Sequence, residues 1–168
     1  MASKADSFFI PNWPVPDSVG SAISLRYGGL SEVPYSSNNM ALHVGDSPIN
    51  VQANRASLVE QLNLTHSPVW LDQIHGVDVI YAPDAKGTPV ADGSYSDQAG
   101  VVCAVMTADC LPVLLCDKQG SQVAVVHAGW RGLAAGVVRN AVTKFPSHDG
   151  SLMAFLGPAI GPCAFEVG

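Results

Sequence analysis

The chain has 168 residues, of which 48% are hydrophobic and only 13% are charged, and its formal net charge is −6. A chain of this length fits one domain and can bury a substantial core, and its low charge excludes a disordered chain. The excess of acidic residues argues against a duplex nucleic-acid binder, which needs a cationic face to release counterions. A patch for a single phosphate stays compatible with this composition, because two arginines suffice.

No segment indicates a membrane protein or an exported one. The most apolar stretch, residues 100–116, contains Asp109 and Pro112 and falls short of the ~20 apolar residues that a spanning helix needs. The first residues lack the apolar region of a signal peptide. The four cysteines form no Cys-x-x-Cys pair, which favours reduced thiols. We therefore expect a cytoplasmic protein without a membrane partner.

The first half of the chain predicts a short strand, a helix and an extended segment. Residues 21–26 are typical of a strand that runs into a glycine turn. Ser47 followed by Pro48 favours a helix to about residue 62, with serine as its cap. Its predicted buried residues are Val51, Leu58, Val59 and Leu62. Residues 69–82 are predicted to be extended, with a bend at Gly76 between two strands, and residues 83–96 to form a loop.

The second half contains three apolar runs, at 101–107, 111–116 and 122–127. Apolar and polar residues alternate poorly in them, so we expect strands whose two faces are both buried in a central sheet. Residues 131–145 predict a second helix, and residues 153–156 predict a last strand. The helix residues expected on the buried side are Leu133, Val137, Val138, Ala141, Val142 and Phe145. Strands and helices in this order indicate an α/β protein.

Two of the five histidines stand out by their position. His66 and His148 lie in polar turns, where a solvated side chain is expected. His75 and His127 each end an apolar run and precede a glycine-bearing turn, and strand ends on a rigid sheet are common places for functional sites. Taken singly, a histidine at such a position is more often a core residue than a ligand.

The register of the predicted hairpin 111–127 determines whether Cys110 lies near His127. A two-residue loop at 118–119 would place the two side chains directly opposite each other, with Cβ atoms ~4.5–5.5 Å apart on one face. A type I turn with a bulge at Gly120 would instead place them on opposite faces. Both registers are compatible with the sequence.

His75, Cys110 and His127 would together form a set of three metal ligands. Two imidazoles and a thiolate with a vacant fourth position are the donor pattern of catalytic rather than structural zinc. The separation of His75 from Cys110 is too long to count as a motif. Three unrelated core residues are therefore the alternative.

Two arginines are candidates for binding an anion. Arg131 belongs to a Gly-Trp-Arg-Gly segment at the predicted start of the second helix, where backbone N–H groups attract anions and a guanidinium adds a bidentate contact. Arg26 lies beside a pair of glycines at a loop. A solvated side chain is the alternative for each arginine.

Several long motifs give the chain a specific resemblance that covers nearly its whole length. The segments are RYGGLS (26–31), NMALHVGD (39–46), QIHG (73–76), MTADCLPVLLCD (106–117), VVHAGWRGLAAGV (125–137) and LGPAIGPCAFEVG (156–168). They resemble the YfiH/DUF152 family, whose members are also described as laccase-domain proteins, polyphenol oxidases, purine nucleoside phosphorylases and peptidoglycan-editing factors.

The resemblance implies an α/β fold of mixed β-sheets that pack together and are flanked by helices, in a single domain over residues 1–168. Because family members continue past this point, we expect the domain to be truncated at its C-terminus. The resemblance also implies a zinc site, or alternatively a copper site, at His75, Cys110 and His127. The predicted catalytic residues are Cys110, His127 and Arg131. The predicted substrate-binding residues are Arg26, Asn39, His43 and Arg131.

The implied activity is phosphorolysis of adenosine, inosine and methylthioadenosine to base and sugar 1-phosphate, with adenosine deamination as a second reaction. The expected partners are a purine nucleoside and phosphate, without nucleic acid or membrane. A monomer is favoured, although the sequence does not determine the oligomeric state.

Two other activities remain alternatives. The first is a copper-dependent polyphenol oxidase, although five histidines without a His-x-His pair argue against a multicopper laccase. The second is a hydrolase that edits peptidoglycan precursors, with Cys110 as nucleophile and His127 as base.

Overall fold

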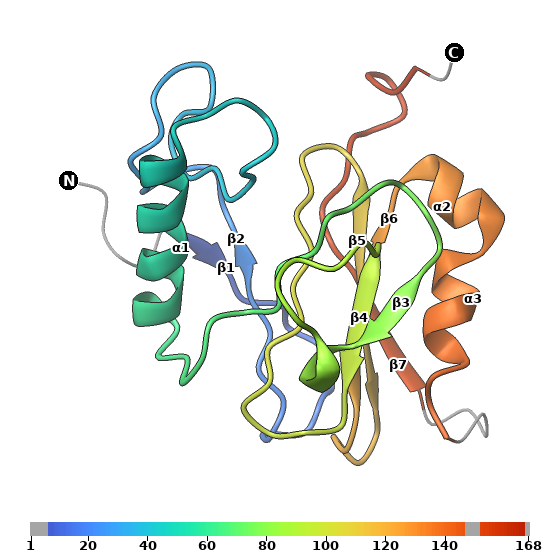
Figure 1. Ribbon diagram of the computed structural model, residues 1–168. Coiled ribbons are helices and arrows are strands. Elements are labelled where there is room, and N and C mark those ends of the chain that lie inside the picture. Colours follow the sequence, from blue (N-terminus) through green and yellow to red (C-terminus); the bar gives the residue numbers. More distant parts are fainter. Residues whose placement is uncertain (1–6, 147–151, 167–168) are drawn as a thin grey trace. The chain divides into compact units, whose positions relative to one another are not determined.

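The structure is a computed structural model that describes residues 7–146 and 152–166 (Figure 1). Its internal contacts divide the chain into two compact units. The first unit comprises Met1–Asn12 and Gly20–Ser67, and the second comprises Trp13–Val19 and Pro68–Gly168. The polar turn expected around His148 lies outside the described residues.

The first unit contains a short two-stranded sheet and one long helix. Strands β1 (Phe8–Phe9) and β2 (Ile23–Ser24) pair antiparallel, so the strand predicted at 21–26 is present but only two residues long. Helix α1 (Pro48–Gln61) confirms the first predicted helix. Ser47 occupies the cap position, but its side chain makes no capping hydrogen bond.

The buried side of α1 differs from the prediction. Val51 is fully buried as expected, whereas Leu58, Val59 and Leu62 are only half-buried. The second buried residue of the helix is polar, since Asn54 is 1% exposed. Apolar spacing does not identify such a residue, because its burial is stabilised by hydrogen bonds instead of by hydrophobic contact.

Asn54 fixes the loop that precedes α1. Its amide group donates to Ser31 Oγ and to the Asn39 carbonyl, each at 2.9 Å. Its Oδ1 accepts the Leu30 N–H at 2.8 Å. Both ends of this buried amide are therefore paired, and with a longer contact to the Ser37 carbonyl at 3.4 Å the Asn54 side chain bonds the loop at four residues.

The second unit is built on a five-stranded mixed sheet with the strand order β3-β4-β6-β5-β7 (Figure 1). The strands are β3 (Val79–Tyr81), β4 (Gly93–Ser96), β5 (Leu111–Asp117), β6 (Val123–Ala128) and β7 (Leu152–Leu156). Strands β3 and β4 run parallel, and the remaining pairs are antiparallel. A 3₁₀ turn, Ala82–Asp84, follows β3. The α/β class with a mixed sheet and the last predicted strand are thus confirmed.

Two short helices follow β6 and lie against one face of the sheet (Figure 1). They are α2 (Trp130–Ala135) and α3 (Val137–Val142), so the single helix predicted at 131–145 is wrong. Gly136 separates them with a φ of +103°. A left-handed residue ends a helix, and glycine adopts this conformation without steric cost.

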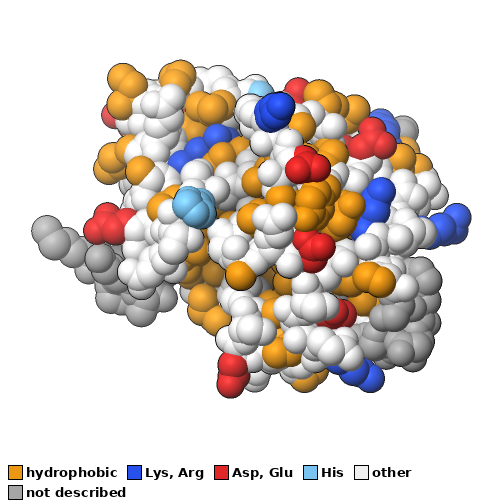
Figure 2. Space-filling view, turned by 60° about the horizontal axis from the view of Figure 1, so that its bottom comes forward, with side chains coloured by type: hydrophobic (Ala, Val, Ile, Leu, Met, Phe, Trp, Pro, Cys, Tyr) orange, Lys and Arg blue, Asp and Glu red, His pale blue; other side chains and the backbone are white. Residues whose placement is uncertain are grey.

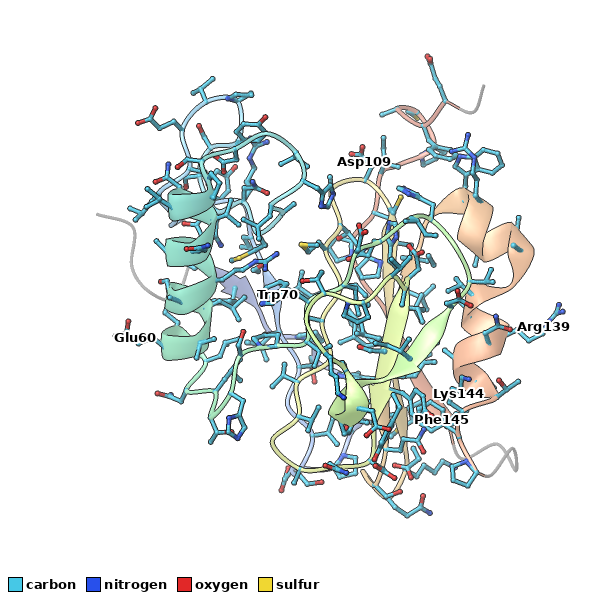
Figure 3. All side chains as sticks on the ribbon, in the orientation of Figure 1. Glu60, Trp70, Asp109, Arg139, Lys144 and Phe145 are labelled. Carbon is cyan, nitrogen blue, oxygen red and sulfur yellow. The ribbon has the colours of Figure 1, made fainter. Side chains whose placement is uncertain are left out.

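The core of the second unit lies between α3 and the sheet. The predicted helix residues that are buried or half-buried there are Val137, Val138, Ala141, Val142 and Phe145. Arg139 projects away from the sheet on the opposite side of α3 (Figure 3). Leu133 was expected to be buried but is 49% exposed. The break at Gly136 takes α2 out of the helical register of α3, so one apolar stripe cannot continue through both helices.

The strand predicted at 101–107 is wrong. This segment makes one isolated bridge, between Cys103 and Val69. The Gln73 side chain accepts the Met106 N–H at 2.7 Å and donates to the Met106 carbonyl at 2.8 Å. Because a side chain satisfies this backbone, the segment needs no neighbouring strand there.

The loop predicted at 83–96 is correct for residues 85–92 but wrong at its end, because Gly93–Ser96 form β4, which lies between β3 and β6 in the sheet. The sequence Gly-Ser-Tyr-Ser has no apolar pattern, but its small residues allow close packing. A Cβ on Gly93 would lie 2.6 Å from Val126 Cγ1, and Ser94 and Ser96 are 0% and 2% exposed. The residues of β4 are therefore small because β6 packs closely against it, and not because they are hydrophobic. Small residues of this kind give no periodic apolar pattern in the sequence.

The β5–β6 hairpin has neither of the two predicted registers. Pro112 pairs with His127, and five residues, 118–122, connect the strands. The Asp117 carboxylate stabilises this turn, because its Oδ1 accepts the Ser121 N–H at 2.7 Å. A connection closed by a side chain in this way is longer than either of the tight turns that the sequence suggested.

The observed register still places Cys110 and His127 on the same face. It differs by two residues from the register that would put them directly opposite, and a shift of two preserves the face of a strand. The two side chains are therefore diagonal neighbours across the hairpin, within reach of each other.

No helix within residues 7–146 and 152–166 is long and apolar enough to cross a membrane. On the face shown in Figure 2, acidic and basic side chains are interspersed with hydrophobic ones, and Lys and Arg form no continuous field.

Candidate metal centre

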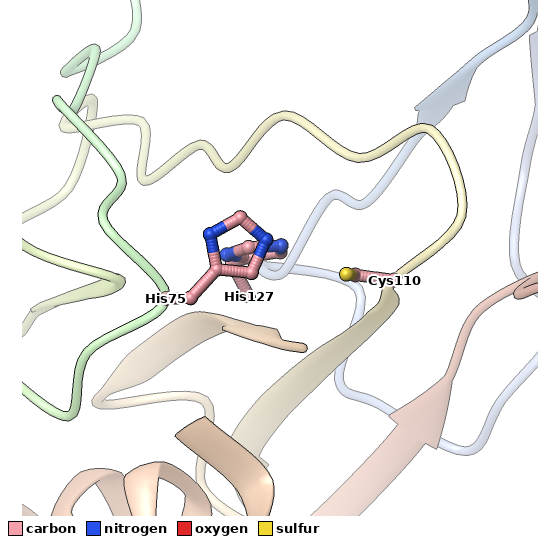
Figure 4. Close-up of side chains that lie close together, drawn as sticks. All are labelled: His75, Cys110 and His127. Atoms are coloured by element: carbon pink, nitrogen blue, oxygen red, sulfur yellow. The ribbon is translucent and has the colours of Figure 1, made fainter. Parts of the chain in front are cut away.

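Three side chains with metal-binding atoms converge at one end of the mixed sheet (Figure 4). They are His75, Cys110 and His127, whose candidate ligand atoms all lie within 4.8 Å of one another. The two histidine rings meet edge to face with centroids 4.7 Å apart, and the Cys110 Sγ points toward them. The structure thus brings together the three residues that the sequence grouped, in place of three unrelated core positions.

A different segment of the second unit positions each of these side chains. His127 lies in β6 and is 4% exposed. Cys110 lies in the bend directly before β5, next to Asp109 on the loop labelled in Figure 3. His75 lies in a turn that precedes β3 and is exposed. The sheet therefore gathers the cluster from positions far apart in the sequence.

Two glycines after β6 leave room for the loops that carry the ligands. A Cβ on Gly129 would lie 2.8 Å from His75 Cδ2 and 3.1 Å from Cys110 Sγ. A Cβ on Gly132 would lie 2.6 Å from the Gly76 carbonyl oxygen. Both glycines of the Gly-Trp-Arg-Gly segment are thus explained by close approach.

The sequence did not identify Asp92, which is fully buried beside the cluster. Its Oδ1 lies 2.8 Å from His127 Nδ1 and accepts the His75 backbone N–H at 3.0 Å. Its Oδ2 accepts the backbone N–H groups of Ile74 at 3.2 Å and Gly76 at 2.6 Å. The available signal was weak, since an acid between two small residues is typical of an exposed turn.

The electrostatics of the site are set by burial and by carboxylates. Burial acts to raise the pKa of Asp92, but hydrogen bonds from His127 and from the backbone of residues 74 and 76 hold it below its ordinary value. Burial raises the pKa of the Cys110 thiol, and the carboxylates of Asp109 and Asp92 add to this effect. A thiolate at Cys110 therefore needs a cation close by.

The donor set fits a metal ion. Two imidazole nitrogens and a cysteine sulfur suit zinc and also copper, and three protein ligands leave one coordination position open. A carboxylate on the second nitrogen of a histidine is the outer contact that metal-bound histidines usually make. Within the part of the chain that the structure describes, this is the one cluster of at least three His, Cys, Asp or Glu side chains with such geometry.

Arg131 lies close in sequence to the cluster, in the first turn of α2. Its side chain is exposed, and its guanidinium carbon lies 4.6 Å from the centroid of the Trp130 ring. The guanidinium thus stacks on an aromatic ring and still faces solvent.

The remaining predicted site residues belong to the first unit, whereas the metal cluster belongs to the second. Arg26 donates through Nε to a loop carbonyl at 3.1 Å. Asn39 donates to Asp46 Oδ2 at 2.9 Å and accepts the Ala41 N–H at 2.9 Å. His43 is exposed. Asn39 therefore takes part in the fold of its own loop.

The fold and the cluster together define a class: an α/β protein whose mixed sheet carries a candidate His/Cys/His metal centre. The family model of the multi-copper polyphenol oxidoreductase laccases matches residues 20–168. The chain belongs to this family, which is the YfiH/DUF152 family of the sequence motifs.

Individual relatives are similar over nearly the whole chain. It is 51% identical over 160 residues to the purine nucleoside phosphorylase YfiH of Escherichia coli strain K12, which covers 95% of this chain and 66% of that protein. It is 48% identical over 163 residues to a purine nucleoside phosphorylase of Pseudomonas aeruginosa, with coverages of 97% and 66%. A crystal structure of a Neisseria meningitidis protein of the DUF152 family matches with a TM-score of 0.91 at 48% identity, over 97% of this chain and 67% of that one. The chain spans just under two thirds of the length of the two curated relatives.

Proposed function

We propose that this chain acts in the zinc-dependent phosphorolysis of purine nucleosides. The proposed substrates are adenosine, inosine and methylthioadenosine, and the products are the free base and the sugar 1-phosphate. Adenosine deamination is proposed as a second reaction. Support comes from the two relatives named purine nucleoside phosphorylase, at 51% and 48% identity.

The observation that carries the proposal is the convergence of His75, Cys110 and His127 within 4.8 Å. A zinc ion held by these residues would supply a Lewis acid. Arg131, exposed two residues after Gly129, offers guanidinium donors that match the geometry of phosphate. Roles for Arg26, Asn39 and His43 stay predictions from the sequence motifs.

Product analysis tests the proposal. Zinc-loaded protein incubated with adenosine and phosphate is expected to release adenine and ribose 1-phosphate, together with inosine where deamination occurs. Chromatography resolves adenine, inosine and hypoxanthine, and release of none of the three contradicts the proposal. Cys110→Ser is expected to lower the rate by about 100-fold or more, because it removes a metal ligand. Cys163→Ser changes an exposed cysteine and is the matched control, expected to keep the wild-type rate.

Metal analysis separates zinc from copper. The proposal expects one zinc ion per chain and phenol oxidation at background level. Stoichiometric copper with phenol oxidation and no nucleoside turnover would overturn it in favour of a polyphenol oxidase. The three donors suit both metals, so the metal content and the two activities have to be measured on the same preparation.

One contact favours a second candidate, hydrolysis of peptidoglycan precursors by Cys110. Asp92 lies on the far nitrogen of His127, which gives the order of nucleophile, base and orienting acid found in catalytic triads. His75 has no role in such a triad, so His75→Ala separates the two candidates. It is expected to abolish the zinc-dependent reaction but to spare cysteine-dependent hydrolysis. Hydrolysis by metal-free protein that alkylation blocks would support the second candidate.

A further inference from the structure

We infer that Asp92 is the positioning residue of this centre: one buried carboxylate fixes both the His127 ring and the turn that carries His75. The inference rests on the proposed metal-dependent function. Two of the three ligands are thereby controlled by a residue that does not itself belong to the cluster. Oδ1 of the carboxylate contacts both the His127 ring and the His75 N–H, and Oδ2 contacts the N–H groups of Ile74 and Gly76.

Oδ1 selects the form of the His127 ring that can bind a metal. The oxygen lies 2.8 Å from Nδ1, and both residues are buried, at 0% and 4% exposure. A carboxylate without a proton only accepts hydrogen bonds, so the ring proton resides on Nδ1. The lone pair is then on Nε2, which is the remaining nitrogen available to a metal ion.

Both oxygens hold the turn of residues 74–76. His75 has a φ of +60°, a left-handed conformation that costs free energy for any residue with a Cβ. Three consecutive backbone N–H groups donate to Asp92, at 3.2, 3.0 and 2.6 Å. Charge-assisted hydrogen bonds of this kind offset the cost and keep the His75 side chain directed to the cluster.

The carboxylate has a fixed origin on the sheet. The Asp92 N–H donates to the Asp78 carbonyl at 3.0 Å, and the Asp92 carbonyl accepts the His127 N–H at 2.7 Å. The next residue, Gly93, begins β4. Asp92 therefore reaches the cluster from the start of a sheet strand, and its side chain is fully shielded from solvent.

Asp92→Asn tests the inference, because an amide has one acceptor end and one donor end. If the amide oxygen stays beside His127, the NH₂ group faces the N–H groups of Ile74 and Gly76. If the oxygen faces the turn, the NH₂ group meets Nδ1, and the ring proton must move to Nε2, where the metal binds. Either orientation impairs one ligand, so we expect zinc affinity to fall about 10- to 100-fold in competition with a chromophoric chelator.

Asp84→Asn is the matched control. It removes the same charge from an exposed carboxyl in the 3₁₀ turn after β3, outside the cluster, and leaves the Asp92 contacts in place. We expect nearly wild-type zinc affinity and a nearly wild-type absorption spectrum of the cobalt-substituted protein, whereas Asp92→Asn changes both. Equal losses in the two variants would show an effect of net charge and overturn the inference, as would an unchanged affinity in Asp92→Asn.

Nuclear magnetic resonance of the wild-type protein supplies a test that needs no variant. With metal removed and the rings neutral, the imidazole nitrogens of His127 are expected to show the proton on Nδ1. A proton on Nε2 would overturn the inference even if Asp92→Asn fails to fold. This readout is separate from the proposed function, since a protein that binds no zinc and turns over no nucleoside would refute that function whatever the tautomer.

Discussion

Gly129 has no Cβ, and the space that a Cβ would occupy lies directly beside the candidate metal ligands His75 and Cys110. The residue has a φ of −61°, which any amino acid adopts, so the glycine is needed for space and not for backbone conformation. The atoms nearest to an added Cβ belong to His75 and Cys110. The glycine is therefore required by the packing of the site and not by the backbone conformation of the turn after β6.

Gly129→Ala is expected to weaken zinc binding by about 10-fold or more without loss of secondary structure. The added Cβ would come within 2.8 Å of His75 Cδ2, closer than folded proteins tolerate, so the ligand side chain has to move. Titration with zinc in the presence of a competing chelator measures the effect. Gly161→Ala is the control, because its Cβ would meet nothing within 4 Å. Equal affinities in the two variants would contradict the steric explanation.

At the scale of elements, the β5–β6 hairpin determines where Cys110 and His127 lie. Its register depends on the five-residue connection that the Asp117 side chain, at the end of β5, stabilises by hydrogen bonds. Burial acts to raise the pKa of Asp117, but hydrogen bonds from the Ser121 hydroxyl and from the backbone of residues 120–122 hold it below its ordinary value. The ionised carboxylate therefore stabilises the folded hairpin.

Asp117→Asn is expected to lower the free energy of unfolding by about 1 kcal/mol at pH 7, because an amide cannot accept all of these hydrogen bonds. A depressed pKa in the folded state gives stability that is present above the unfolded value of about 4 and is lost as pH falls through the folded value. The difference between wild type and variant should therefore shrink below about pH 4. Urea unfolding at a series of pH values measures it, and a difference independent of pH would contradict the role of the charge.

The sequence predicts well the elements that have a clear local signal, either an apolar run that forms a buried strand or a residue pair that is typical of a helix start. Strands β5 and β6 are apolar runs in the centre of the sheet, and α1 begins at a serine and proline pair. Strand β4 is not predicted, because its residues are small where Val126 packs against Gly93 and therefore show no apolar alternation. The break at Gly136 is equally hidden, since apolar residues continue on both sides of it and only the backbone angle ends the helix.

At the scale of the whole molecule, the candidate centre belongs to one unit of the two. His75, Cys110 and His127, together with Asp92, all lie within Pro68–Gly168. A ligand that binds the folded state and not the unfolded chain adds its binding free energy to stability. A metal ion bound at this centre would therefore stabilise the sheet that positions its ligands.

Zinc at about 100 times its dissociation constant is expected to stabilise the protein by about 2.7 kcal/mol, which corresponds to a rise of about 5–10 °C in Tm. Differential scanning calorimetry with zinc and with chelator measures this rise. His75→Ala is expected to abolish it, whereas His66→Ala, at an exposed histidine of the first unit, is expected to retain it. A zinc-dependent rise that persists in His75→Ala would place the bound ion elsewhere.

The candidate site could be predicted only in part, for a reason that concerns the whole chain. Cysteine and histidine at strand ends are conspicuous, so the three residues could be grouped as a hypothesis, but the hairpin register and the alternative of three unrelated core residues stayed open, and the family resemblance implied the site. Asp92 was missed because its role depends on β4, whose existence no sequence pattern indicates. Its partners lie 35 residues away at His127 and 16 to 18 residues away in the turn at 74–76.

The dispersal of the ligands along the chain also has a consequence for biogenesis. Positions 75, 110 and 127 come together only when β3, β4, β5 and β6 have paired, and in an unfolded chain the closure of such loops opposes their encounter. A metal ion at this centre would therefore bind a sheet that has already formed, unlike the ion that nucleates a compact zinc finger. We expect metal loading, where it occurs, to follow completion of the sheet.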